Sequence, residues 1–142
     1  MADTRFEFLE HTADAKFLAY GKTIEEAFSN AAIATFEIMT ETQKIQKKIR
    51  KDIDISAKNI ESLLYEFIEH LLFLVDTEAF LLRSVDKITI KKTDKGYVLH
   101  ATIDGDNAKG YEVKTQIKAA TYADMFIKET KNNVTIQMVV DI

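Results

Sequence analysis

The feature that most constrains the fold of this chain is a long apolar stripe between residues 60 and 75. Its members recur every three or four residues, which places them on one face of a helix. They are Ile60, Leu63, Leu64, Phe67, Ile68, Leu71, Leu72, Leu74 and Val75. Ser56 or Asn59 can cap the start of this helix, and we expect it to stop around residues 76–78. A helix with so wide an apolar face must be covered by other elements of the fold.

A second amphipathic helix is predicted earlier in the chain, after Thr23. Thr23 and Glu26 have the spacing of a capping box, with Thr23 as the N-cap and Glu26 at the third helical position. Apolar residues then follow at helical spacing as far as Met39, and the helix is expected to end near residues 40–42. The chain therefore carries two long helices.

The remaining apolar residues mostly alternate with polar ones, which is typical of strands. A hairpin is expected over residues 5–21, and single strands over residues 46–56, 81–92, 97–103, 112–119 and 134–142. Residues 93–96 and 104–110 are expected to form turns, and residues 122–128 a strand or a short helix. This order predicts one α+β domain over residues 1–142, in which two long helices pack on one side of a mostly antiparallel or mixed sheet.

Composition excludes several classes of protein. The 142 residues include no cysteine, so disulfides and thiolate metal sites are ruled out. No apolar run approaches the roughly 18 residues of a membrane span. The formal net charge of −4 argues against a protein whose main task is to hold a phosphate backbone. We therefore expect a cytoplasmic protein with no membrane contact and only an indirect relation to nucleic acid.

Several polar patterns have an ordinary structural interpretation. The stretch from Asp104 to Asn107 resembles the start of a calcium loop but fails the EF-hand pattern further on, so it is interpreted as a hairpin turn. Glu66, Glu69 and His70 are interpreted as a solvated helix face. The basic runs at residues 44–51 and 87–95 alternate with apolar residues and are interpreted as charged outer faces of strands. No phosphate-binding loop, dinucleotide fingerprint or nucleophile elbow is present, so no familiar catalytic constellation is found.

Two features remain without an ordinary interpretation. The first is a polar cluster inside the predicted hairpin, made of Glu10, His11, Thr12 and Asp14. The second is the final strand, in which Asp141 stands beside the α-carboxylate of Ile142. Adjacent carboxylates repel each other unless a cation joins them, and such oxygen ligands suit Ca²⁺, Mg²⁺ or Mn²⁺. The alternative for the final strand is a solvated chain end.

The chain resembles the archease family. Four segments carry the resemblance, and they cover nearly the whole chain in the right order. They are Glu10 to Asp14, Gly21 to Ala32, Leu63 to Glu78, and Ile117 to Tyr122 together with the closing residues 139–142. Each segment is a weak signal alone, but the combination is specific.

The resemblance implies a non-catalytic helper of the GTP-dependent RNA ligase that joins tRNA halves during splicing. In this family the helper promotes guanylylation of the ligase and supports multiple turnover. The resemblance also implies a divalent metal, with Ca²⁺ as the first expectation, bound by Asp14, Asp141 and Ile142. It implies a functional role for Lys118, whereas Ala123 departs from a histidine that is common in the family. Supporting roles for His11 and Glu10 are our own inference.

Two other functions stay open from the sequence. One is a metal- or small-ligand-binding domain with a different protein partner. The other is a stand-alone hydrolase that uses Asp14 and His11 as acid and base. The oligomeric state and the surface that contacts the ligase are not determined by the sequence.

Overall fold

The computed structural model describes residues 4–10 and 14–142 of the chain. Within them it contains two long helices, one short 3-10 helix and eight strands. In chain order these are β1 (Phe6–Leu9), β2 (Asp14–Gly21), α1 (Ile24–Met39), η1 (Thr42–Lys44), β3 (Ile49–Ala57), α2 (Ile60–Glu78), β4 (Phe80–Thr93), β5 (Gly96–Asn107), β6 (Ala119–Ala120), β7 (Phe126–Thr130) and β8 (Asn133–Asp141).

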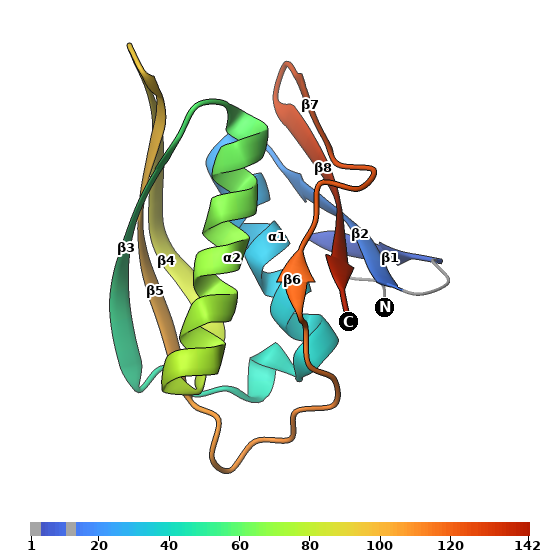
Figure 1. Cartoon of the computed structure of the whole chain (residues 1–142), viewed down its shortest axis with the longest axis vertical. Helices are drawn as coiled ribbons and strands as arrows, with labels where there is room; N and C mark the ends of the chain where they lie inside the picture. The colour runs from blue at the N-terminus through green and yellow to red at the C-terminus, as the bar shows by residue number, and fades with distance from the viewer. Residues whose placement is uncertain (1–3, 11–13) are drawn as a thin grey trace.

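The two helices lie between two sheets (Figure 1). One sheet has the strand order β3-β5-β4, and the other has the order β1-β2-β8-β6 with β7 also paired to β8. Neighbouring strands in both sheets run antiparallel. The predicted α+β class, with two long helices packed on antiparallel strands, is confirmed, although the strands form two sheets where a single sheet was expected.

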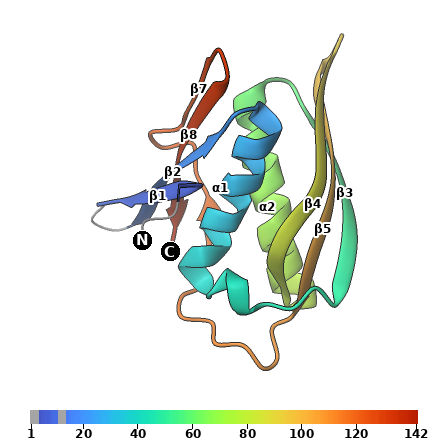
Figure 2. The same cartoon turned by 180° about the vertical axis from the view of Figure 1, so that it is seen from behind.

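The reason for a second sheet lies in α1, which is apolar around most of its circumference. Its buried residues include Ala27, Phe28, Ala31, Ala34 and Phe36, and these do not fit on one narrow stripe. A helix of this kind must be covered on more than one side. Figure 2 shows α1 between the two sheets, where it packs against β2 on one side and β4 on the other.

The helix starts follow the predicted capping chemistry. The Thr23 hydroxyl accepts a hydrogen bond from the Glu26 amide at 3.1 Å, and the Glu26 carboxylate accepts one from the Lys22 amide at 3.0 Å. At the start of α2, Asn59 is the N-cap, and its side chain accepts from the Ser62 amide at 2.8 Å. Each side-chain oxygen satisfies an amide that has no partner within the helix.

The predicted stripe of α2 forms the centre of the core. Leu63, Leu64, Phe67, Ile68 and Leu71 are fully buried, and the Phe67 ring stacks on Phe28 of α1 with centroids 6.2 Å apart. Burial of a large apolar side chain contributes about 1.5–3 kcal/mol, so this stripe is a major source of stability. None of the helices in the described residues is both long enough and apolar enough to cross a membrane.

The predicted turn at residues 104–110 is wrong in its first half, because β5 continues to Asn107. Asp104 is 6% exposed and its carboxylate accepts a hydrogen bond from Arg50 Nε at 3.0 Å. Gly105 lies so close to β4 that a Cβ atom there would stand 2.0 Å from the Leu81 carbonyl oxygen. The Asp and Gly residues therefore serve close strand packing and an ion pair rather than a turn.

The predicted strand over residues 112–119 is also wrong, because only Ala119 and Ala120 pair with β8. The preceding residues form an irregular connection between the two sheets, tied to the end of α1 by the Lys114 amide, which donates to the Met39 carbonyl at 2.7 Å. Alternation alone does not make a strand where no neighbouring strand offers a ladder. Residues 126–130 form β7, so the strand interpretation is confirmed for the second part of the 122–128 segment.

Candidate metal centre

The candidate centre lies where the start of β2 meets the end of β8. Asp14 and Asp141 are directly opposite each other in this antiparallel pair. The next pair along, Ala15 and Val140, faces the core, and Val140 is fully buried. Because side chains alternate along a strand, Asp14 and Asp141 share the face of the sheet that points away from the core.

Two like charges directly opposite each other on one face of a sheet destabilise the pair. A divalent cation between the two carboxylates reverses the sign of this interaction. The donors are hard oxygens, which fits Ca²⁺ or Mg²⁺ better than a soft metal. The two side chains therefore fit a divalent cation chemically, and the ladder register brings them together from opposite ends of the chain.

The other predicted ligand and the supporting residues are less well defined by the structure than the Asp14–Asp141 pair. Ile142 follows Asp141 directly, so its carboxylate is adjacent in sequence to the Asp14–Asp141 pair. The residue is 38% exposed. Glu10 follows β1 and is exposed. His11 lies outside the described residues, and its supporting role stays a prediction. Within residues 4–10 and 14–142, no three His, Cys, Asp or Glu side chains gather as a metal-binding group. The predicted third ligand is the terminal carboxylate of Ile142, which is not a side chain.

Lys118 is brought beside Asp141 through the backbone. The Lys118 amide donates a hydrogen bond of 2.7 Å to the Asp141 carbonyl, and Ala119 is the ladder partner of Asp141 on the side away from β2. Figure 1 shows β6 lying between α2 and β8, close to the end of the chain. Three segments that are distant in sequence thus meet at Asp141.

The segment after β6 is fastened to β8 by Thr121. Its hydroxyl and its amide both donate to the Val139 carbonyl, at 2.7 Å and 3.2 Å. Ala123, at the position where a histidine is common in the resembling family, follows in a turn and its amide donates to the Thr121 hydroxyl oxygen at 3.2 Å. Asp124 in the same turn lies 3.4 Å from the ammonium of Lys16, which is on β2.

Comparison with known proteins gives the family. The model of the Archease protein family matches residues 6–142. The chain belongs to the archease family. The Protein archease of Sulfolobus acidocaldarius is 39% identical over 139 residues, which cover 98% of this chain and 99% of the relative.

Solved structures agree with the archease fold. The solution structure of Methanobacterium thermoautotrophicum protein 1598 is similar at a TM-score of 0.83 and 34% identity, over 97% of this chain and 99% of that protein. The crystal structure of an archease from Thermotoga maritima, described as a possible chaperone, is similar at a TM-score of 0.56 and 18% identity, over 94% of each chain.

One residue of this archease has a role that the sequence did not reveal. Glu69 was interpreted as part of a solvated helix face, but its carboxylate accepts a hydrogen bond from the Ala120 amide at 2.9 Å. This contact joins α2 to β6. No local pattern predicts it, because the two residues are 51 positions apart. Glu66, on the same helix, is exposed as expected.

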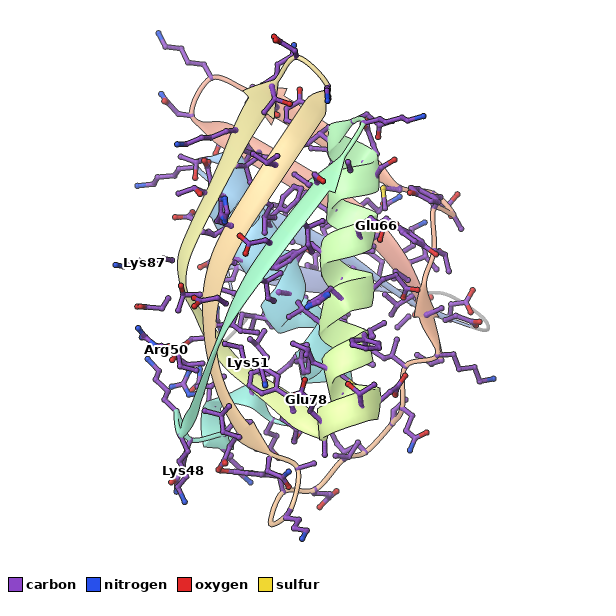
Figure 3. All side chains as sticks on the ribbon, turned by 60° about the vertical axis from the view of Figure 1, so that its left-hand side comes forward. Lys48, Arg50, Lys51, Glu66, Glu78 and Lys87 are labelled. Atoms are coloured by element: carbon purple, nitrogen blue, oxygen red, sulfur yellow. The ribbon has the colours of Figure 1, made fainter. Side chains whose placement is uncertain are left out.

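Cations of the basic run at residues 44–51 form ion pairs. Arg50 contacts both Asp104 and Asp86, and these carboxylates raise the pKa of its guanidinium, with the Asp104 hydrogen bond as the largest cause. Lys51 extends from β3 to an ion pair with Glu78 at the end of α2 (Figure 3). The exposed Arg50 with its two aspartates agrees with the charged outer face predicted for residues 44–51, whereas Lys51 shares the strand parity of Ile49 and Ile53 and reaches α2.

Proposed function

We propose that this archease is a non-catalytic activator of a GTP-dependent tRNA-splicing RNA ligase. In this proposal it promotes guanylylation of the ligase and so sustains multiple turnover. Membership of the archease family supports the proposal, as does the absence of a nucleotide-binding motif in the sequence. The absence of cysteine agrees with a reducing compartment, so we place the protein in the cytoplasm.

We further propose that activation depends on a divalent cation, Ca²⁺ first among the candidates, bound by Asp14, Asp141 and the α-carboxylate of Ile142. The observation that carries this proposal is the ladder pairing of Asp14 with Asp141 on the face away from the core. Two carboxylates opposite each other weaken their own cross-strand contact, and a cation between them makes that contact favourable.

The chemistry of guanylyl transfer agrees with such a site. Charge develops on phosphate oxygens during the transfer, and a divalent cation supplies the charge that neutralises it. The two aspartates would supply ligand oxygens to such a cation, and the Lys118 backbone is fixed on Asp141 beside them. RNA is contacted through the ligase, which agrees with the formal net charge of −4.

The central experiment is a multiple-turnover ligation assay with the cognate ligase, limiting GTP, and RNA halves that end in a 2′,3′-cyclic phosphate and a 5′-hydroxyl. The wild-type protein should raise the number of turnovers. Asp14→Asn and Asp141→Asn should remove this gain, because each loses a charged ligand but keeps its size. Glu66→Gln is the matched control, since it removes one exposed carboxylate elsewhere. The absence of stimulation by the wild-type protein would contradict the proposed function.

A second experiment addresses the terminal carboxylate. Two extra residues after Ile142 displace the α-carboxylate, so calorimetric affinity for Ca²⁺ should fall. The same two residues added before Met1 should leave the affinity unchanged. Equal affinities for the two extended proteins would show that the terminal carboxylate is not a ligand.

A further inference from the structure

The segment from Lys118 to Tyr122 contacts β8 on one side and α2 on the other. Toward β8, the Lys118 amide donates to the Asp141 carbonyl at 2.7 Å, and Thr121 donates to the Val139 carbonyl. Toward α2, the Ala120 amide donates to the Glu69 carboxylate at 2.9 Å, and the Tyr122 ring stacks on Tyr65. The segment is therefore a strap between the last strand and the second helix, as its place in Figure 1 suggests.

The two contacts on α2 come from a single face of the helix. Tyr65 and Glu69 are four residues apart, which places them one turn from each other. The Tyr65 and Tyr122 rings are nearly parallel, with an interplanar angle of 6° and centroids 4.3 Å apart. Burial raises the pKa of the Tyr65 phenol, and the negative charge of Glu69 is the next cause. The two side chains therefore also interact electrostatically.

The Glu69 contact has a specific structural purpose. The Thr121 amide donates to β8, and neighbouring amides along a strand point to opposite sides, so the Ala120 amide points away from β8, toward the edge of the sheet. An amide at a sheet edge has no strand to accept its hydrogen bond. Glu69 supplies the acceptor, and because Ala120 is 3% exposed, water has little access to replace it.

We propose that Glu69, supported by Tyr65, is a positioning residue that clamps the Lys118–Tyr122 strap onto the end of β8 and so fixes Asp141 and Lys118 for activity. This inference rests on the proposed metal site and deepens it. Groups that orient metal ligands from outside the coordination sphere commonly change metal affinity when they are lost. Glu69 acts on Asp141 through the two-residue strand β6, which is the ladder partner of Asp141 and Val140.

The first test measures the clamp itself by amide hydrogen exchange. Glu69→Ala should speed exchange of the Ala120 and Lys118 amides by roughly fivefold or more, the effect of losing one net hydrogen bond. Amides of β5 should be unchanged and serve as an internal measure that the protein is folded. Glu69→Gln keeps an oxygen acceptor and should restore slow exchange. Unchanged exchange at Lys118 in Glu69→Ala would overturn the proposal.

The second test measures the consequence at the metal site, with Ca²⁺ alone as the calorimetric probe. Glu69→Ala should lower Ca²⁺ affinity roughly tenfold, the low end of the range for groups outside the coordination sphere, and Glu69→Gln should recover most of it. Tyr65→Ala should also lower it, whereas Tyr65→Phe keeps the stacked ring and should not. Faster exchange with unchanged Ca²⁺ affinity would overturn the role at the site.

A matched control exists at the opposite sheet. Glu25 of α1 likewise accepts a hydrogen bond from a strand amide, that of Ile90 on β4, at 3.4 Å. Glu25→Ala also removes a helix glutamate that accepts from a strand amide, but at the sheet that does not carry the proposed metal site. It should therefore leave Ca²⁺ affinity and Lys118 exchange unchanged. An equal loss of Ca²⁺ affinity in Glu25→Ala would show a general stability effect and overturn the clamp.

The outcomes separate this inference from the proposed function. If the wild-type protein bound no Ca²⁺, the metal site would be wrong, and the clamp would be judged by Lys118 exchange together with stimulation of the ligase. If Ca²⁺ bound to the wild type and the Glu69 variants equally well, the metal site would stand and the positioning role of Glu69 at that site would be wrong.

Discussion

Asp14, the first residue of β2, pairs directly with Asp141, the last residue of β8, so the two carboxylates stand on one face of the sheet. The residues are separated by most of the chain, and only the antiparallel register brings them together. Their neighbours Ala15 and Val140 turn toward the core, which fixes the register because a slip of either strand by one residue would turn its aspartate toward the core. Packing of the core thus determines the geometry of the candidate centre.

The opposed carboxylates predict that the effect of Asp141→Asn on stability depends on Ca²⁺. In a chelator, removal of one charge should stabilise the protein by about 0.2–1 kcal/mol, the usual size of a cross-strand pair. With saturating Ca²⁺, the wild type should gain stability through binding and the variant should not. Urea unfolding with and without Ca²⁺ measures both effects. A Ca²⁺-induced gain that persists in Asp141→Asn would contradict the assigned ligand.

Gly105 of β5 is predicted to be far less replaceable than Gly110 in the loop that follows. An added Cβ would stand 2.0 Å from the Leu81 carbonyl oxygen and 2.6 Å from the Phe80 ring. Gly105→Ala should therefore destabilise the protein by about 3 kcal/mol or more. Gly110→Ala is the control: its Cβ meets open space, and only the φ of +90° opposes it, at about 1 kcal/mol. Similar unfolding midpoints for the two variants would contradict this interpretation.

Two phenylalanines of α2 are predicted to differ sharply. Phe67 is fully buried against Phe28, whereas Phe73 is 56% exposed. Phe67→Ala should cost about 3–5 kcal/mol through lost burial and a cavity. Phe73→Ala should change stability by less than about 0.5 kcal/mol. Both changes have the same effect on helix propensity, so their difference in urea unfolding isolates burial. Equal destabilisation would show that the two faces of α2 are wrongly assigned.

The carboxylate of Asp106 is predicted to make stability depend on acid pH. A hydrogen bond of 2.7 Å from the Tyr111 hydroxyl is the main reason why the pKa of Asp106 is lowered from 3.8. A lowered folded pKa gives a stabilising contribution that is present above pH 3.8 and is lost as the pH falls through the folded value. Tyr111→Phe should therefore raise the pKa of Asp106 and weaken this dependence.

Titration of the Asp106 carboxyl carbon by NMR, in the wild type and in Tyr111→Phe, measures the shift directly. Urea midpoints at neutral and acid pH then show whether the dependence shrinks. Tyr97→Phe is a suitable control, because it removes the hydroxyl of a different tyrosine, at the start of β5, without touching Asp106. An Asp106 pKa that is equal in the wild type and in Tyr111→Phe would contradict the assigned cause.

The helices were predictable because their signals are local. The Thr23 cap, the Asn59 cap and the stripe around Leu64 and Phe67 all lie within the elements that they specify. The strand errors have the opposite origin. The segment from Glu112 looks like a strand by alternation, but no neighbouring strand offers it a ladder before Ala119. Asp104 and Gly105 look like turn residues, yet Arg50 and Leu81, both distant in sequence, make them parts of a strand.

By itself the sequence determined the two helices, the antiparallel α+β class and the candidate ligands, because periodicity, capping residues and residue chemistry are properties of short segments. The tertiary structure alone decided that Asp14 meets Asp141, that Glu69 holds the edge of β6, and that the strands divide into two sheets. These outcomes depend on register and on packing between residues far apart in the chain. Such contacts are settled by the burial of a shared core, which no short segment encodes.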